Sequence, residues 1–280
     1  SVKSLTFLGD MFDGVQCPCI LLQLVATGKP LSTVGMRIED RTRTFIIAME
    51  RTVVPENFSF RMTDEEYRVL EKIKNSIPVC YLADHADFAL GIVTGNNKKF
   101  LSAEKTEHSE MVLKGTDICK YHINPAKQYL RFEPEQFQQV APLEIYRAPE
   151  KLLYRFISNQ LVVAYDDRQM LSLNSCNIVI PKIEGMQIKY ILAILNSSVS
   201  QFVYQKEFHS IKVLRAHMEH IPIPRVGKAI QNEIIAMTEP LICGMGKEAA
   251  ETCQKRLDCR IMDLFRLSAE EQWIIRHALH

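Results

Sequence analysis

The chain has 280 residues, a formal net charge of +1 at pH 7, 47% hydrophobic residues and 24% charged residues. These proportions are ordinary for a globular protein and exclude the disordered and fibrous classes, while the length allows two compact units. No apolar run approaches the roughly 20 residues that span a bilayer, so neither a membrane segment nor a signal peptide is expected.

Cysteine usage indicates the cellular compartment and argues against a metal site. The eight cysteines include Cys17-Pro-Cys19 but no Cys-x-x-Cys pair, so a zinc ribbon is not expected. The others are scattered through apolar segments, as is typical of reduced thiols. We therefore expect a cytoplasmic protein.

Residues 1–84 predict the end of a larger domain and a linker helix. The apolar segment 15–25 predicts a buried strand, and a second strand is expected over about residues 43–54. Thr63-Asp-Glu-Glu66 has the spacing of a capping box and predicts the start of a short helix. Two strands and one helix are too few for an independent core.

Residues 85–226 predict a mixed body of short strands and one long helix. The helix is expected over residues 188–206, where apolar residues recur at helical spacing. The expected strands alternate with polar turns and cover residues 88–93, 151–157, 161–165 and 177–180.

Residues 227–280 predict a mostly helical segment. Pro240 and the glycines at 244 and 246 indicate a kink or a turn between two helices, and Ser268-Ala-Glu-Glu271 is a second capping box. The predicted fold class is therefore α+β: a mixed body with a helical C-terminal segment, preceded by the remnant of a Rossmann-like domain.

Charge is weakly concentrated in the mixed body. Residues 95–215 hold 16 Lys and Arg against 12 Asp and Glu, whereas residues 225–280 hold eight of each. This surplus is small for a protein that binds nucleic acid.

Amide and cationic side chains gather in the turn that follows the strand 88–93. Asn96, Asn97, Lys98 and Lys99 occupy this turn, and Gly95 permits a positive φ. Asparagine bonds the edge of adenine and lysine bonds phosphate or guanine, so these four are candidate DNA contacts. The alternative is an exposed hairpin tip with solvated charges.

A second polar turn, Lys114-Gly-Thr-Asp117, precedes Ile-Cys-Lys120-Tyr121. The glycine permits a sharp turn, and the Asp117 carboxylate is expected to bond its own backbone. Lys114, Lys120 and Tyr121 are candidate DNA contacts, with solvated surface lysines as the alternative.

The strand and hairpin that follow supply further candidates. Arg155 is the foremost, because a guanidinium matches phosphate or guanine in a two-point contact. Tyr165 is placed to stack on a base and Arg168 occupies the adjacent turn. Residues 171–177 follow as a polar strand with several amides and hydroxyls, none of which the sequence singles out.

The basic run after the helix 188–206 adds Lys206, Lys212 and Arg215, a mixture that suits a phosphate-tracking edge or a solvated face. His217 and His220 share a helix face if this segment is helical, but a third ligand is missing, so no metal site is expected.

Five strings in this order resemble the TaqI-like C-terminal specificity domain, the target-recognition module of type IIG restriction–modification enzymes. They are Gly91–Phe100, Leu113–Tyr121, Ala148–Arg155, Ile191–Ser198 and Ile221-Pro-Ile-Pro224. The resemblance covers about residues 85–275 and implies that the chain reads double-stranded DNA in a bacterial or archaeal cytoplasm. It is looser over the first 60 residues, where Phe12 to Leu24 is similar to the final hairpin of a methyltransferase domain.

The resemblance also implies a parent protein that methylates the N6 amine of adenine with S-adenosylmethionine, with or without a nuclease. The methyltransferase domain of the same parent chain would then be a partner of these residues. No catalytic or cofactor residue is expected in this chain, because it has no Pro-Pro pair and no Asp/Glu-x-Lys triplet. Its only Gly-x-Gly, Gly244-Met-Gly246, lies in the helical segment rather than after a first strand.

A protein-interaction or spacer module is the alternative function. The apolar stripe of the helical segment, which includes Ile234, Met237, Leu241, Leu264 and Trp273, resembles the spacer helices of type I restriction specificity subunits. Such a stripe is also typical of an ordinary core.

Overall fold

A computed structural model describes residues 1–280 except 16, 27, 29–31, 52–59, 209 and 280. The chain divides into two compact units: residues 1–71 with 206–208, and residues 72–205 with 209–280. Each unit is described by itself. The mixture of helices and small sheets confirms the predicted α+β class.

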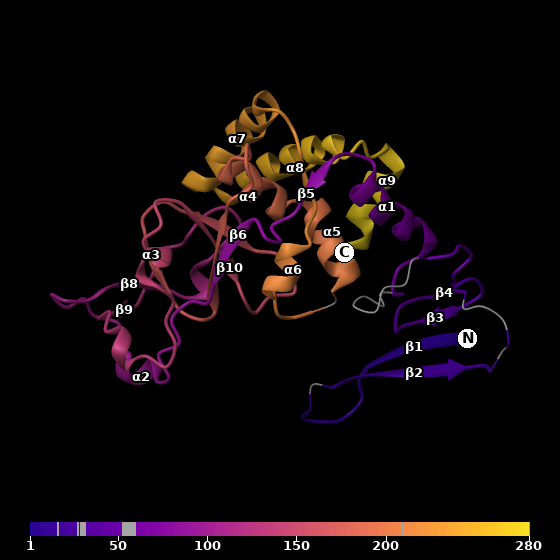
Figure 1. Ribbon diagram of the computed structural model, residues 1–280, viewed down its shortest axis with the longest axis horizontal. Helices are drawn as coiled ribbons and strands as arrows, with labels where there is room; N and C mark the ends of the chain where they lie inside the picture. The colour runs from indigo at the N-terminus through magenta and orange to yellow at the C-terminus, as the bar shows by residue number, and fades with distance from the viewer. Residues whose placement is uncertain (16, 27, 29–31, 52–59, 209, 280) are drawn as a thin grey trace. The chain divides into compact units, whose positions relative to one another are not determined.

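The first unit is built on one four-stranded sheet (Figure 1). Its strands are β1 (Val2–Asp10), β2 (Pro18–Leu24), β3 (Arg37–Glu39) and β4 (Thr44–Ile46), in the order β2-β1-β3-β4. β1 is antiparallel to β2 and parallel to β3, and Leu5, Met36, Ile38, Ile47 and Phe60 form a small core.

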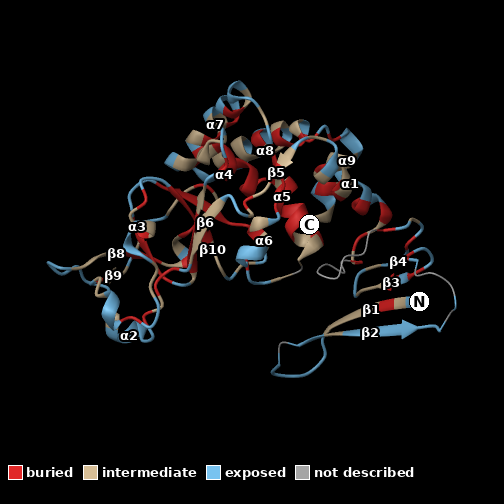
Figure 2. Cartoon of the chain, in the orientation of Figure 1, coloured by how far each residue is buried: buried red, intermediate tan, exposed pale blue. Residues whose placement is uncertain are grey.

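A strand is present within the predicted segment 15–25, but the prediction that it is buried is wrong. Among the described residues β2 lies at the sheet edge and pairs with β1 alone, and the strand is exposed (Figure 2). Its Leu21 and Leu24 are 61% and 63% exposed. The second predicted strand overlaps β4, and its residues 52–54 lie outside the described residues.

The capping box before α1 (Asp64–Asn75) is confirmed. The backbone N–H of Thr63 donates to the Glu66 carboxylate at 2.8 Å, and that of Glu66 donates to the Thr63 hydroxyl at 3.3 Å. The expected apolar face of this helix, Tyr67, Leu70 and Ile73, is buried.

The second unit is organised around an antiparallel sheet of order β11-β10-β13-β6. Its strands are β6 (Ala86–Ala89), β10 (Lys151–Arg155), β11 (Val163–Asp166) and β13 (Cys176–Pro181). A small sheet of order β12-β8-β9-β7 adjoins it, formed by β7 (Leu101–Ser102), β8 (Glu110–Leu113), β9 (Tyr129–Leu130) and β12 (Leu171–Ser172). A third pair joins β5 (Val79–Cys80) to β14 (Ile223–Pro224).

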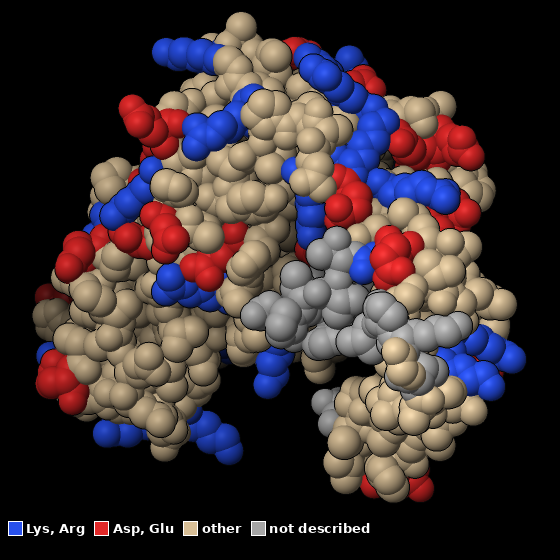
Figure 3. Space-filling view, turned by 45° about the vertical axis from the view of Figure 1, so that its right-hand side comes forward, with Lys and Arg blue, Asp and Glu red and all other residues tan. Residues whose placement is uncertain are grey.

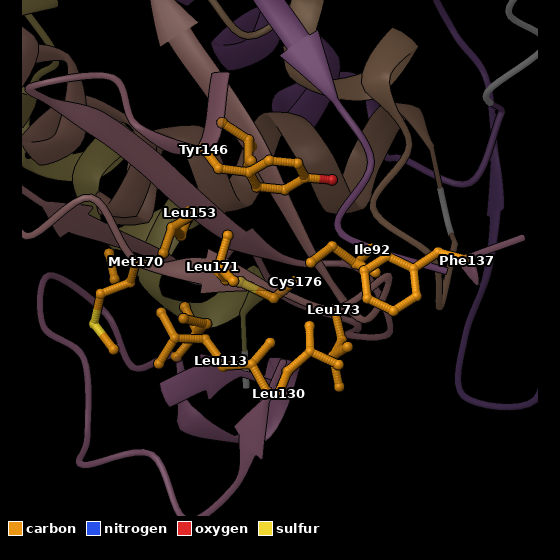
Figure 4. Close-up of a cluster of buried hydrophobic side chains, with 14 of the residues drawn as sticks. Ile92, Leu113, Leu130, Phe137, Tyr146, Leu153, Met170, Leu171, Leu173 and Cys176 are labelled. Carbon is orange, nitrogen blue, oxygen red and sulfur yellow. The ribbon is translucent and has the colours of Figure 1, made fainter. Parts of the chain in front are cut away.

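One apolar cluster holds these sheets together. Leu113 and Leu130 from the small sheet meet Leu153 and Cys176 from the larger sheet, and Tyr146 and Phe137 close the cluster (Figure 4). Short helices cover its rim: α2 (Asn97–Phe100), two 3₁₀ turns (Gly115–Asp117 and Pro134–Gln136) and α3 (Leu143–Tyr146).

The predicted helix 188–206 is two helices, α4 (Ile188–Asn196) and α5 (Ser198–Glu207). The break falls at Ser197, whose extended backbone ends α4, and the Asp258 carboxylate accepts from both the N–H and the hydroxyl of Ser198. α4 is buried and packs on β10 and β11.

The helical C-terminal segment is confirmed as α7 (Lys228–Cys243), α8 (Lys247–Leu264) and α9 (Ala269–Ala278), preceded by the short α6 (Arg215–Glu219). The predicted break falls at Gly244, which has φ +78°, and the Ser268–Glu271 capping box opens α9. No helix of the described residues is both long and apolar enough to cross a membrane.

Candidate nucleic-acid interface

The turn at 94–99 exposes its four predicted candidates, but its amide oxygens are already engaged. Oδ1 of Asn96 accepts from the backbone N–H of Lys99 at 3.2 Å and caps α2, and Oδ1 of Asn97 accepts from the hydroxyl of buried Thr94 at 2.6 Å. A two-point contact with adenine needs the oxygen as well as the NH₂ group. The free NH₂ groups of both asparagines are therefore better matched to phosphate.

Lysines complete this turn. The Lys98 ammonium is exposed and has no partner among the described residues, whereas that of Lys99 lies 4.6 Å from the ring centroid of Phe100. Both remain candidate phosphate contacts.

A short turn between β12 and β13, residues 173–176, is enclosed by two glycines. A Cβ on Gly91 would lie 2.1 Å from the carbonyl oxygen of Leu173, and one on Gly115 would lie 2.4 Å from that of Ser175. Real Cβ atoms essentially never come within 3.0 Å of such a neighbour. Both glycines are therefore required by close backbone approach rather than by a positive φ.

Hydrogen bonds fix the same 173–176 turn. The N–H of Ile92 donates to Ser172 O at 2.7 Å, and the N–H of Asn174 donates to Ile92 O at 3.1 Å. On the other side, the N–H of Gly115 donates to the Ser175 hydroxyl at 3.0 Å. The 173–176 turn is thus tied to both flanking segments.

Arg155 holds the 114–117 turn from inside, which corrects its predicted role as the foremost DNA contact. Its Nε donates to Gly115 O at 2.9 Å and its Nη2 to Ile118 O at 2.6 Å. The side chain is half-buried, so the fork that would match a guanine is occupied by backbone carbonyls.

Asp117 has the local role that was predicted. Its carboxylate accepts from the backbone N–H of Lys114 at 2.8 Å and closes the turn. The Lys114 ammonium is half-exposed and has no partner among the described residues, so it remains a candidate.

Lys120 and Tyr121 are corrected to structural positions. The Lys120 ammonium donates to Asn196 O, the last residue of α4, at 3.2 Å, and burial lowers the pKa of its amine. Tyr121 is 2% exposed, and its backbone forms a β-bridge with Ala164 of β11. Neither side chain is placed to meet DNA.

Arg168 is presented by a turn that a buried ion pair anchors. The Asp166 carboxylate accepts from the backbone N–H groups of Arg168 and Met170, both at 2.9 Å. Behind it, Lys151 Nζ lies 2.5 Å from Asp166, donates to Tyr146 O at 2.6 Å and, like Asp166, is completely buried. Burial lowers the pKa of Lys151, although Asp166 opposes the shift.

The Arg168 side chain is exposed and has no partner among the described residues. It lines a recess of about 570 Å³ together with Asn124 and the Gly244–Gly246 turn. Tyr165 is corrected: it is 8% exposed, its hydroxyl donates to Glu150, and Lys189 Nζ lies 4.8 Å from its ring. Its ring is therefore not free to stack on a base.

The three cations of the predicted basic run differ in exposure. Lys206, which belongs to the first unit, is 6% exposed and lies 2.8 Å from the Glu66 carboxylate, so its prediction as a DNA contact is corrected. In the second unit Lys212 is exposed without a side-chain partner, and Arg215 is exposed but lies 2.7 Å from Glu219.

In the second unit, exposed candidate cations lie at the two ends of β10. The N–H of Phe156 donates to Ser175 O and that of Val213 to Phe156 O, so Lys212 belongs to the Arg155 end of β10 with the two clamped turns. Lys151 pairs with Asp166 at the other end of β10, where Arg168 is. Exposed cations therefore stand at both ends of this strand.

Two exposed polar side chains at the Arg155 end were not predicted as candidates, namely Thr116 and Asn174. Neither makes a side-chain hydrogen bond among the described residues. The signal that could have found them is the pair of glycines, since a glycine next to a strand often marks close backbone approach.

The described residues form no cluster of three or more His, Cys, Asp and Glu side chains that could hold a metal ion. Nδ1 of His217 accepts from the N–H of Leu214, and His220 is paired with Ala216 O. On the face shown in Figure 3, Lys and Arg side chains are interspersed with Asp and Glu rather than forming one basic field.

Residues 110–223 match the family model described as the TaqI-like C-terminal specificity domain. The predicted resemblance is confirmed for these residues, which include three of the five strings completely; the Gly91–Phe100 string lies outside the match. No curated protein matches the chain.

Several solved structures resemble the chain. The DNA complex of the type IIL restriction–modification enzyme MmeI shares 10% identity at a TM-score of 0.57, with 99% of this chain and 45% of that chain covered. The type IIG restriction endonuclease BpuSI shares 9% identity at a TM-score of 0.42, with 94% and 43% covered. The HsdS subunit from Thermoanaerobacter tengcongensis shares 13% at 0.39, with 77% and 50% covered.

At these identities the similarity concerns the fold, and of these three structures MmeI has a TM-score above 0.5. The chain spans half or less of the length of each of these three structures.

Proposed function

We propose that this chain, whose residues 110–223 form a TaqI-like C-terminal specificity domain, reads the sequence of double-stranded DNA for a restriction–modification enzyme. The observation that carries the proposal is the family match over the residues that contain the 114–117 turn, the 173–176 turn and Lys212. The fold similarity to the type IIL restriction–modification enzyme MmeI, whose structure is a complex with DNA, supports the proposal.

The exposed cations supply the phosphate contacts. Lys98, Lys114, Arg168 and Lys212 have side chains without partners among the described residues, so no internal ion pair must break before they meet a phosphate. Such contacts fix the register of a protein on the duplex, while the base edges give the specificity.

The parent enzyme in this proposal transfers a methyl group from S-adenosylmethionine to N6 of adenine in the bacterial or archaeal cytoplasm. The Gly244–Gly246 turn joins α7 to α8 instead of following a strand, so this Gly-x-Gly does not have the place of a cofactor-binding loop. We therefore assign the cofactor and the reaction to a methyltransferase domain of the parent chain, and these residues to target recognition.

The apolar stripe behind the alternative function is mostly core. Ile234 and Leu241 are 0% and 5% exposed, whereas Trp273 is 56% exposed and stacks on His277. Among the described residues of this stripe, one exposed aromatic side chain gives no extended apolar surface, so the helical segment gives the interaction-module alternative less support.

Salt-dependent binding tests the proposal. Anisotropy titrations of the parent protein with duplex DNA should show affinity that falls linearly with log salt, and Lys98→Ala or Lys212→Ala should each reduce the slope by about 1. Lys228→Ala, which removes an equally exposed lysine from the start of α7, is the matched control and should leave the slope unchanged. Salt-independent binding, or the same slope change in all three variants, would refute the proposal.

A further inference from the structure

Two polar side chains stand beside the hydrogen bond that joins the 114–117 and 173–176 turns. Gly115 N donates to the Ser175 hydroxyl at 3.0 Å, and the next residue along from Gly115 is Thr116, while Asn174 directly precedes Ser175. Both Thr116 and Asn174 are exposed. The fold thus places an exposed threonine and an exposed asparagine on two adjoining turns at one end of β10.

The contacts of four residues fix the backbone that carries these side chains. Gly91 and Gly115 approach the 173–176 turn too closely for any Cβ, the Arg155 guanidinium clasps Gly115 O and Ile118 O, and Asp117 closes the 114–117 turn. A side chain on a backbone held in this way binds without the entropy cost of ordering its turn, which favours discrimination between bases.

The other polar candidates are less free. The amide oxygens of Asn96 and Asn97 accept bonds within their turn, and the Arg155 fork is used on backbone carbonyls. The Asn174 amide has both its oxygen and its NH₂ group unengaged among the described residues. It therefore keeps the full donor–acceptor pair that matches N6 and N7 of adenine.

We infer that Asn174 and Thr116 determine specificity, with Asn174 reading an adenine in the major groove and Thr116 contacting the same or the adjacent base pair. Arg155 acts as a positioning residue for both. Lys114 and Lys212, which lie at the same end of β10, hold the flanking phosphates. This inference rests on the proposed DNA-reading function and assigns the residues that perform it.

The experiment is a selection from a library of DNA duplexes with a randomised central stretch, followed by sequencing of the bound fraction. The parent protein is compared with its Asn174→Ala, Asn174→Asp and Thr116→Val variants. Asn232→Ala is the matched control, because Asn232 is an exposed asparagine on α7. An Arg155→Lys variant keeps the charge and removes the two-point clasp.

In Asn174→Ala the preference for adenine at one position should fall about 5- to 150-fold, the range of one good base contact. Asn174→Asp should move that preference toward cytosine, whose N4 donates to a carboxylate. Thr116→Val should weaken the preference at the same or the neighbouring position. Arg155→Lys should weaken the base preferences at these positions without changing the salt dependence of binding. Asn232→Ala should have the base preferences of the wild type.

The outcomes separate the two hypotheses. A wild-type protein that enriches no sequence refutes the proposed function itself. A wild-type protein that enriches a site, with the same base preferences retained in both Asn174 variants, overturns this inference and leaves the proposed function standing.

Discussion

Replacing Gly91 with alanine tests whether the 173–176 turn is clamped as the structure indicates. The new Cβ would lie 2.1 Å from Leu173 O, and the shortest contact that real Cβ atoms show is 3.0 Å, so the backbone must shift by about 0.9 Å. No flexible side chain can absorb that displacement, because the carbonyl groups of Leu173 and Cys176 are the contacts.

The expected loss of unfolding free energy can be estimated from the hydrogen bonds that the shift would weaken. The Ile92–Ser172, Asn174–Ile92 and Gly91–Asn177 hydrogen bonds all meet at this point, and each contributes about 1 kcal/mol. Overpacking adds about 1–3 kcal/mol, while the lower backbone entropy of the unfolded alanine variant returns about 0.5–1 kcal/mol. We expect Gly91→Ala to lower the free energy of unfolding by about 3–5 kcal/mol.

Urea unfolding followed by circular dichroism measures this loss. The control is Gly227→Ala, since a Cβ at Gly227 meets nothing within 4 Å and costs at most the preference of a helix N-cap, about 1 kcal/mol. A Gly91→Ala variant as stable as the Gly227→Ala control would show that the turn is not held by close packing, and the reasoning on recognition would fail with it.

Two further predictions concern buried charges. Lys151→Met should lower the free energy of unfolding by about 3–5 kcal/mol, because it leaves the Asp166 carboxylate buried without its partner. The double variant Lys151→Met/Asp166→Leu should be more stable than Lys151→Met in the same urea titration, and an equal or lower stability would contradict the assignment. In the first unit, burial raises the pKa of Glu66 but the hydrogen bonds from Arg43 and Lys206 outweigh it, so the pKa is lowered from 4.5. A carboxyl with a lowered folded-state pKa stabilises the fold above its unfolded pKa and loses that contribution as the pH falls through the folded value. Wild-type stability should therefore fall more steeply below about pH 4.5 than that of Glu66→Gln, and parallel pH profiles would refute the pairing.

Local chemistry was predictable from the sequence. Both capping boxes and the turn at Gly244 were found because the residues that form them are adjacent in the chain, and their hydrogen bonds do not depend on the rest of the fold. The exposed lysines of the 94–99 turn were found for the same reason. Here sequence pattern and structure agree.

The roles of single cations were not predictable, because they depend on partners distant in the sequence. Lys206 is paired with Glu66, 140 residues away, and Arg155 clasps carbonyls 40 and 37 residues away. In the sequence these side chains are indistinguishable from exposed Lys212. Gly115 illustrates the same limit: it reads as a turn glycine, yet its reason is the approach of Ser175 O.

β2 shows the opposite failure. Its continuous apolar run is typical of a strand covered on both faces, and the structure gives it one neighbouring strand and exposed side chains. An apolar run therefore predicts a strand that is suited to burial, but it does not show whether other parts of the chain cover that strand. Among the described residues, β2 is not covered.

The two groups of exposed cations set a scale for the interface. β10 separates Lys114 and Lys212 at one end from Arg168 at the other, and its five residues rise by about 13 Å at roughly 3.3 Å per step. Successive phosphates on one DNA strand are about 3.4 Å apart along the helix axis, so the two groups suit phosphates about four base pairs apart.

The small charge surplus of the mixed body is consistent with such an interface. A protein that relied on charge alone would need a continuous basic face, whereas a few unpaired cations at fixed separations set the register and leave discrimination to rigid polar turns. The clamped turns at the Arg155 end fulfil that second requirement, because their backbone cannot adapt to a mismatched base without losing the close contacts at Gly91 and Gly115.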